Sequence, residues 1–143
     1  MPIPNLSERD FKTVLEQVPL IVVDVLIKNA DKLVLVKRGS EPFKGSWHIP
    51  GGFLVYGEDP REAVSRIAKI ECGISSLVIS DLVGAFSLRD KDPRGHLVSL
   101  FYTIETTDTP VSREGEEVAW FSFRDLPKEL LWYHRDMILE TSQ

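Results

Sequence analysis

The sequence predicts one α+β (mixed α/β) domain spanning residues 1–143. Three observations lead to this prediction. Several apolar runs have strand character, two of them close enough together to form a hairpin. Between the later runs lies an amphipathic helix with clear start and stop signals. No repeat, low-complexity tract or linker divides the chain, so strands and helices are expected to share one core.

The first half of the chain predicts one helix followed by strands. Ser7 is a helix-capping residue and opens an amphipathic stretch that runs to Val18. The sequence Pro50-Gly51-Gly52 predicts a backbone bend between two short apolar stretches. The expected strands of this half are residues 20–28 and 32–37, joined as a hairpin, and the two stretches within 47–54.

The second half predicts two helices and three strands. Asp59 followed by Pro60 is a strong helix start, and Gly73 is suited to the position just after a helix end. The expected elements are a helix over residues 61–72, strands over 77–87, 96–105 and 118–123, and a helix within 128–139.

Composition narrows the classes of function. A net charge of −5 and a pI of about 5.2 argue against a non-specific nucleic-acid binder. No apolar run reaches the roughly 18 residues of a membrane span, and residues 1–5 do not resemble a secretory signal. The single cysteine, Cys72, excludes an internal disulfide, so a reducing, cytoplasmic location is expected. An acidic protein that binds a phosphate ester needs local positive charge, from a metal ion or from arginines.

One carboxylate of the helix over 61–72 falls on its apolar side. On a helical wheel Glu71 falls inside the apolar arc, whereas Cys72 falls on the polar side. A buried carboxylate is costly unless an ion pair, hydrogen bonds or a metal compensates it. An arginine partner and a divalent metal are therefore both open as explanations. The apolar arc consists of Ala63, Val64, Ile67, Ala68 and Ile70.

The spacing of residues around this helix is similar to a known motif. Gly52 is followed after five residues by Glu58, after seven more by Arg66, and then by Glu71 and Gly73. This pattern resembles the Nudix box, and the segments 47–52 and 120–127 also look like that family. The resemblance implies the Nudix fold, a mixed sheet between helices. It also implies a hydrolase, dependent on Mg²⁺ or Mn²⁺, that acts on a nucleoside diphosphate linked to another group.

The box departs from the family pattern at two positions. Ile67 and Ile70 stand where most of the family has glutamates that bind metal or act as the base. Fewer carboxylates imply fewer metal ions, so one ion is expected, and a base from outside this helix. Glu58 is a further candidate, as a metal ligand or as the base.

The GDP-mannose mannosyl hydrolase branch of the family lacks glutamates at the same two positions, and this chain resembles it. In that branch, water attacks the sugar carbon. That resemblance implies a homodimer formed through the N-terminal helix (residues 1–18). It makes Glu71 and the Gly51 carbonyl metal ligands, and Arg38 and Arg66 contacts of the diphosphate or of the glutamate. The similar residues Asp10, Phe11 and Asp24 become candidates for substrate binding.

The match to this branch is incomplete. The branch has an arginine where this chain has Phe53, and a histidine base in the loop before the last strand. Here that loop is acidic and offers Glu114, Glu116 and Glu117, which either include the base or are simply solvated.

A second resemblance points to other substrates. Residues 92–95, Asp-Pro-Arg-Gly, look like a segment of Nudix enzymes that cleave ADP-ribose by attack on phosphorus, which makes Arg94 a candidate for substrate binding. A simple turn is the alternative. The first expectation is a hydrolase of a nucleoside diphosphate sugar such as GDP-mannose, with water attacking the sugar carbon. Attack at phosphorus and a nucleotide-binding module without catalysis are the alternatives.

The remaining polar residues have simpler explanations. His48, His96 and His134 lack the spacing of metal ligands and are expected at the surface or in packing. Asp24 interrupts an apolar strand, so we expect a buried partner or a substrate contact. Arg66 has a possible partner in Glu62, four residues earlier.

Overall fold

The computed structural model describes residues 6–141; the segment 1–5, expected not to be a secretory signal, lies outside them. Its core is a seven-stranded mixed sheet of order β3-β2-β1-β6-β5, with β4 added to β1 and β7 to β2. β1 runs parallel to β6 and antiparallel to β2 and β4. The elements are α1 (Glu8–Gln17), β1 (Leu20–Asn29), β2 (Lys32–Lys37), β3 (Trp47–His48), β4 (Gly51–Phe53), α2 (Pro60–Cys72), β5 (Val78–Ser87), β6 (Leu97–Glu105), β7 (Glu117–Ser122) and α3 (Trp132–Thr141).

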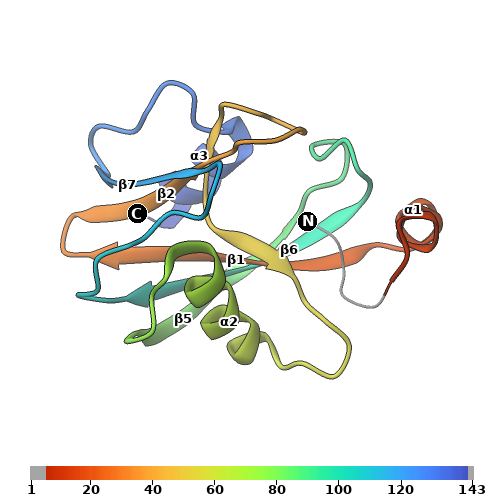
Figure 1. Cartoon of the computed structure of the whole chain (residues 1–143), viewed down its shortest axis with the longest axis horizontal. Helices are drawn as coiled ribbons and strands as arrows, with labels where there is room; N and C mark the ends of the chain where they lie inside the picture. The colour runs from red at the N-terminus through yellow and green to blue at the C-terminus, as the bar shows by residue number, and fades with distance from the viewer. Residues whose placement is uncertain (1–5, 142–143) are drawn as a thin grey trace.

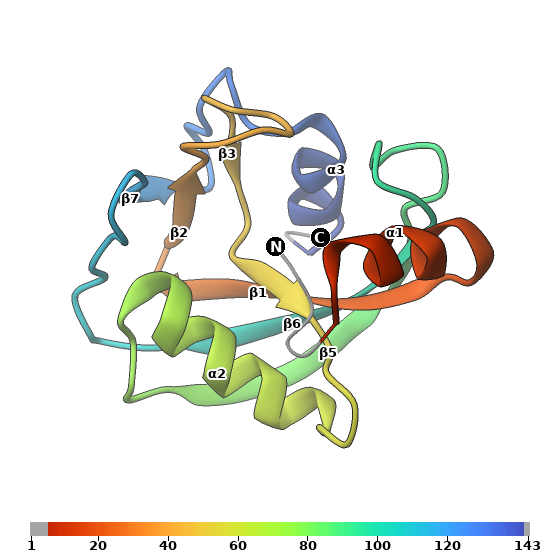
Figure 2. The same cartoon turned by 45° about the vertical axis from the view of Figure 1, so that its right-hand side comes forward.

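Helices cover the sheet on both sides (Figure 1, Figure 2), as the resemblance noted in the sequence implies. Successive residues of β1 point to opposite faces. Val23 and Val25 pack in the core cluster that contains the buried residues of α2, whereas Val22 and Leu26 pack with those of α3. The predicted α+β class is confirmed. Asp24, between Val23 and Val25, belongs to the α3 face by the same alternation.

The termini of α2 follow the predicted signals. Pro60 opens the helix, and the Asp59 amide donates to the Glu62 carboxylate across the first turn, at 3.3 Å. Gly73 closes the helix with φ of 64°, a left-handed conformation that glycine adopts without steric cost. These interactions fix where the C-terminal turn of α2, which carries Glu71, meets the sheet.

The helical wheel placed two residues of α2 wrongly. Ile70 is 52% exposed, and Cys72 is fully buried. Cys72 packs in the core cluster between α2 and the sheet, with Ile74 and Ile104 among its members. A helical wheel considers one helix alone and does not show which other segments surround its last turn.

The last helix starts later than predicted, at Trp132 instead of near residue 128. The preceding segment pairs with β3 instead. The Trp47 amide donates to the Glu129 carbonyl, and the Leu131 amide donates to the Trp47 carbonyl. The backbone groups that would form the first helical turn are thereby used to join the segment to the sheet.

α1 packs at the side of the sheet with little burial (Figure 2). Ser7 caps it through a hydrogen bond from the Asp10 amide, as predicted, and none of its residues is buried. The ring of Phe11 contacts that of Phe53 edge-on, with centroids 5.4 Å apart. Dimerisation through this helix stays a prediction, which sedimentation tests. No helix in the described range, 6–141, is long and apolar enough to span a membrane.

Placing glutamates at positions 67 and 70 should have very different effects on the free energy of unfolding. Ile67→Glu places an unpaired charge in the core and should lower the free energy of unfolding by about 3–5 kcal/mol. Ile70→Glu, on the exposed side, should change it by less than about 1 kcal/mol. Urea denaturation of both variants measures this difference, and equal losses would show that Ile67 is not packed as described.

Candidate active site

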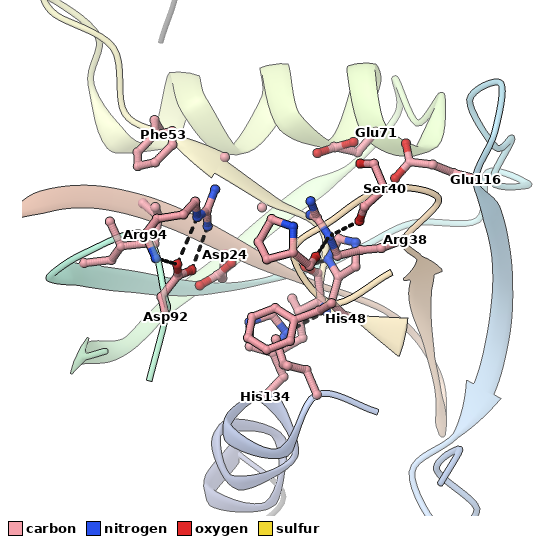
Figure 3. Close-up of a pocket in the computed structure, with 18 of the residues that line it drawn as sticks. Asp24, Arg38, Ser40, His48, Phe53, Glu71, Asp92, Arg94, Glu116 and His134 are labelled. Carbon is pink, nitrogen blue, oxygen red and sulfur yellow. Dashed lines mark hydrogen bonds and ion pairs between the residues drawn. The ribbon is translucent and has the colours of Figure 1, made fainter. Parts of the chain in front are cut away.

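A cavity of about 640 Å³ opens between the C-terminal end of α2 and the start of α3 (Figure 3). Its walls come from β1, the loop after β2, the β3–β4 segment, the end of α2, the loop after β5 with the start of β6, the loop before β7, and the start of α3. It unites seven residues that the sequence singled out: Asp24, Arg38, Gly51, Glu71, Arg94, Glu114 and Glu116. The remaining candidates, Asp10, Phe11, Glu58, Arg66 and Glu117, do not line it.

Glu71 is buried at the α2 end of the cavity and is only 5% exposed. Arg113, from the loop before β7, forms an ion pair with its Oε2 atom. This contact lacks hydrogen-bond geometry, so Oε2 accepts no hydrogen bond within residues 6–141. Burial raises the pKa of Glu71, and the charge of Arg113 opposes that rise. The predicted arginine partner thus exists, and it meets Oε2 as an ion pair without a hydrogen bond.

Arg66 and Glu58 form a bidentate pair beside the cavity. Arg66 Nε donates to Glu58 Oε2 at 2.7 Å, and Nη2 donates to Glu58 Oε1 at 3.0 Å and to the Phe53 carbonyl at 2.8 Å. The hydrogen bonds from Arg66 lower the pKa of Glu58. The suggested Arg66–Glu62 pair is therefore wrong, because Glu62 instead binds the amide at the helix start. This pair holds the segment after β4 against α2.

Asp24 is buried on the cavity floor and has the partner that the sequence led us to expect. Ser99 donates its hydroxyl to Asp24 Oδ2 at 2.5 Å. Burial raises the pKa of Asp24 to about 6, although this hydrogen bond and Arg94 oppose the shift. A side chain on Gly51 would collide with Asp24 Oδ1, so only glycine fits here.

Residues 92–95 do more than form a turn. Arg94 Nε donates to Asp92 Oδ1 at 2.9 Å, and Nη2 donates to Oδ2 at 2.7 Å, a bidentate pair that lines the cavity. Burial disfavours the charge on Asp92, but Arg94 holds the pKa of Asp92 below its ordinary value. The Arg94 guanidinium lies 5.5 Å from the centroid of the Phe53 ring. Phe53 therefore supports an arginine from another loop.

Two loops close the α2 end of the cavity. Arg38 Nε donates to the Pro42 carbonyl at 2.6 Å, which folds its loop around the guanidinium. A side chain on Gly39 would collide with the Gly115 carbonyl, so this loop touches the loop before β7. Arg113 there also donates to Glu116 at 2.7 Å. Three arginines thus line the cavity, but five carboxylates line it too, so the arginines alone do not make it positive.

Sequence reasoning missed several cavity residues because they are distant in the chain. Arg113 was seen only as part of an acidic loop. His48 and His134 were expected at the surface or in packing; both are buried and both line the cavity. His134 Nδ1 accepts a hydrogen bond from the Ile49 amide at 3.0 Å, which ties α3 to the sheet. The only sequence signal for a histidine in the cavity wall was the place of His48, shortly before the Pro50-Gly51-Gly52 bend.

No group of three or more His, Cys, Asp or Glu side chains is arranged to hold a metal within the described part of the chain. The donors near the α2 end are hard oxygens, the Glu71 carboxylate among them. These donors are too few to hold Mg²⁺ by themselves, so substrate phosphates and water would have to supply the other ligands.

The fold is a mixed sheet between helices, with a cavity lined by carboxylates and arginines. A NUDIX domain model matches residues 18–140, and the chain belongs to the Nudix hydrolase family. It is 37% identical over 122 residues to an ADP-ribose pyrophosphatase from Methanocaldococcus jannaschii, covering 84% of this chain and 71% of that protein.

Solved structures agree on the fold. The NUDIX domain of Shewanella oneidensis NrtR, complexed with ADP ribose, superposes with a TM-score of 0.75 at 23% identity, covering 96% of this chain and 92% of that one. A MutT NUDIX hydrolase from Burkholderia pseudomallei also gives 0.75 at 23% identity, covering 87% and 98%.

Burial of the Asp24 carboxylate should make stability depend on pH. Because its folded pKa of about 6 exceeds the ordinary 3.8, the native state favours the protonated form. The resulting stability is complete below pH 3.8 and is lost as pH rises through 6, a difference of about 3 kcal/mol. Asp24→Asn keeps an acceptor for Ser99 without ionising, so it should stabilise the protein at pH 8 and hardly at pH 4.

Thermal unfolding at both pH values measures this effect. Asp81→Asn, at an exposed position on β5, is the control. An equal effect of Asp24→Asn at the two pH values would show that Asp24 does not titrate as described.

Proposed function

We propose that this Nudix hydrolase cleaves the diphosphate of a nucleoside diphosphate sugar, with ADP-ribose as the first substrate to test. The observation that carries the proposal is the Asp92–Arg94 pair, which lines the same cavity as Glu71. The segment containing this pair resembles that of ADP-ribose-cleaving enzymes. The relative from M. jannaschii, an ADP-ribose pyrophosphatase, supports the same substrate class.

The arginines provide the binding chemistry for the diphosphate. Arg38, Arg94 and Arg113 all line the cavity. Guanidinium groups suit phosphate because they donate two parallel hydrogen bonds and keep their charge. Arg94 is already oriented by Asp92 and by the Phe53 ring, so little conformational freedom is lost when a ligand binds.

Glu71 and the Gly51 carbonyl are the residues that would hold a Mg²⁺ or Mn²⁺ ion. The buried Oε2 atom of Glu71, which accepts no hydrogen bond in the described structure, supports this assignment. When bound, such an ion neutralises charge on the diphosphate. Arg113 pairs with Glu71 in the structure, so binding of the ion requires this arginine to turn toward the ligand or toward Glu116.

Glu116 is the base we propose for activating water. It lines the cavity beside Glu71, whose pKa it raises through its charge, and Arg113 holds it there. Glu114 lines the same wall, whereas Glu117 lies at the start of β7 and does not. Glu58 has both oxygens engaged by Arg66 and lies outside the cavity, which favours a structural role over a catalytic one.

Attack at the sugar carbon, as in the GDP-mannose mannosyl hydrolase branch, is a second candidate. One observation favours it: Glu71 is the only box glutamate of α2 that reaches the cavity, since positions 67 and 70 hold isoleucines. A site with one helix carboxylate supports fewer metal ions, and attack at carbon depends on the metal mainly to stabilise the diphosphate as it leaves.

Phosphorus NMR of ADP-ribose and of GDP-mannose, each incubated with protein and Mg²⁺, separates these candidates. Attack at phosphorus yields AMP and ribose 5-phosphate from ADP-ribose, which is the expected result. ADP and ribose, or GDP and mannose, would instead mean attack at the sugar carbon. A ligand that raises the melting temperature but is never consumed would identify a binding module without catalysis.

Glu71→Gln should lower kcat/KM for the substrate by at least about 100-fold, because the amide no longer balances charge at the metal position. Glu105→Gln, an exposed change at the end of β6, is the matched control and should act like wild type. Steady-state kinetics at saturating Mg²⁺ measure this. If Glu71→Gln retains wild-type turnover, the metal assignment is wrong.

A further inference from the structure

The imidazole of His48 is a buried group of the cavity wall with no role in the chemistry above. It is 8% exposed, lies on β3 and lines the cavity. Figure 3 shows it on the α3 side of the site, near His134, whereas Glu71 projects from α2.

The hydrogen bond to Ile49 fixes the tautomer of His48. Nδ1 lies 2.8 Å from the Ile49 carbonyl oxygen. A carbonyl only accepts, so Nδ1 carries the hydrogen and donates. Burial lowers the pKa of His48 to about 4, with Arg38 and Arg113 contributing, although the Ile49 carbonyl and Glu116 oppose this. The ring is therefore uncharged at neutral pH, and Nε2 holds a lone pair.

This lone pair has no protein partner. Nε2 is buried and makes no hydrogen bond within residues 6–141. Buried polar atoms in folded proteins almost always have a hydrogen-bond partner. Because Nε2 lies in a cavity wall and the described chain offers no donor, the missing donor is expected on a ligand. A donor on a bound ligand would supply it.

The surroundings of His48 define what kind of ligand group fits. Its ring is the end of a connected set of rings: His48 to His134 at 6.3 Å, His134 to Tyr133 at 4.9 Å, and Tyr133 to Phe43 at 6.4 Å between centroids. Aromatic rings favour the flat faces of bases and the apolar faces of sugars. A phosphate oxygen would set an anionic acceptor against the Nε2 lone pair, which is repulsive.

Resting on the proposed function, we propose that His48 Nε2 accepts a hydrogen bond from an N–H or O–H group in the uncharged part of the ligand. That donor belongs to the nucleobase or to a sugar, and the phosphates lie at the arginines instead. His48 is then a residue that selects ligands by hydrogen bonding, distinct from the residues that bind charge.

The first test compares two substitutions of His48 in binding ADP-ribose by calorimetry with Mg²⁺ replaced by Ca²⁺ to slow turnover. Leu has a similar volume and no acceptor, so His48→Leu should weaken binding about tenfold, the effect of one lost hydrogen bond. His48→Gln retains an acceptor and should remain within about threefold of wild type. His96→Gln, at a partly exposed histidine that does not line the cavity, is the control.

Fragments of the ligand locate the donor. A deficit of His48→Leu with AMP points to the nucleobase or its ribose, and a deficit with ribose 5-phosphate points to the terminal sugar. A deficit with inorganic pyrophosphate alone would overturn the proposal, and so would wild-type affinity of His48→Leu for every ligand. Melting temperatures of the variants verify that they are folded.

Nitrogen NMR of the imidazole rings supplies a measurement that does not depend on the substrate. In the free protein Nδ1 of His48 should be protonated and Nε2 not; the reverse tautomer overturns the proposal whatever the enzyme cleaves. If wild type binds GDP-mannose and not ADP-ribose, the substrate assignment fails alone, and GDP-mannose and GMP replace the ligands above. A wild type that binds neither overturns both proposals.

Discussion

The burial of one carboxylate, Glu71, on the apolar face of α2 is the constraint on which the site depends. The helix places it against the sheet, where burial raises its pKa and leaves its Oε2 atom without a hydrogen bond. An uncompensated charge in such a place would cost several kcal/mol, about as much as a large part of the stability of a domain. Arg113 compensates it, and this brings the loop before β7 to the cavity, where Gly115 meets Gly39 of the loop after β2. The walls of the site thus assemble around the charge of Glu71.

The cavity has two chemically different regions. Three loops bring the guanidinium groups of Arg38, Arg94 and Arg113 to the cavity, and Asp92 holds Arg94 in a fixed orientation. The region near α3 is lined by aromatic rings and a neutral imidazole. A nucleoside diphosphate derivative has matching parts, a charged centre and uncharged ends. Asp24 lies buried beneath the site, and the free energy that its ionisation costs is a sign that the cavity is not optimised for stability alone.

The sequence predicted those features that depend on local pattern. The limits of α2 follow from Pro60 and Gly73, and the burial of Glu71 follows from helical periodicity, so both were predictable. What depends on another segment was not. Cys72 packs into the core cluster between α2 and the sheet, which a wheel cannot show, and the start of α3 is delayed because residues 129–131 bond to Trp47. The partner of Glu71, Arg113, lies on a loop that meets α2 only in the folded chain.

The central claim is that Glu71 and the phosphates of the ligand together form the metal site. Electron paramagnetic resonance of Mn²⁺, titrated into the protein with and without ADP-ribose, tests it most directly. The account predicts weak binding of Mn²⁺ to the protein alone, binding at least about tenfold tighter when ADP-ribose is present, and loss of that enhancement in Glu71→Gln. Equal enhancement in the wild type and in Glu71→Gln would contradict the account, because the metal would then be held without the carboxylate around which the site is built.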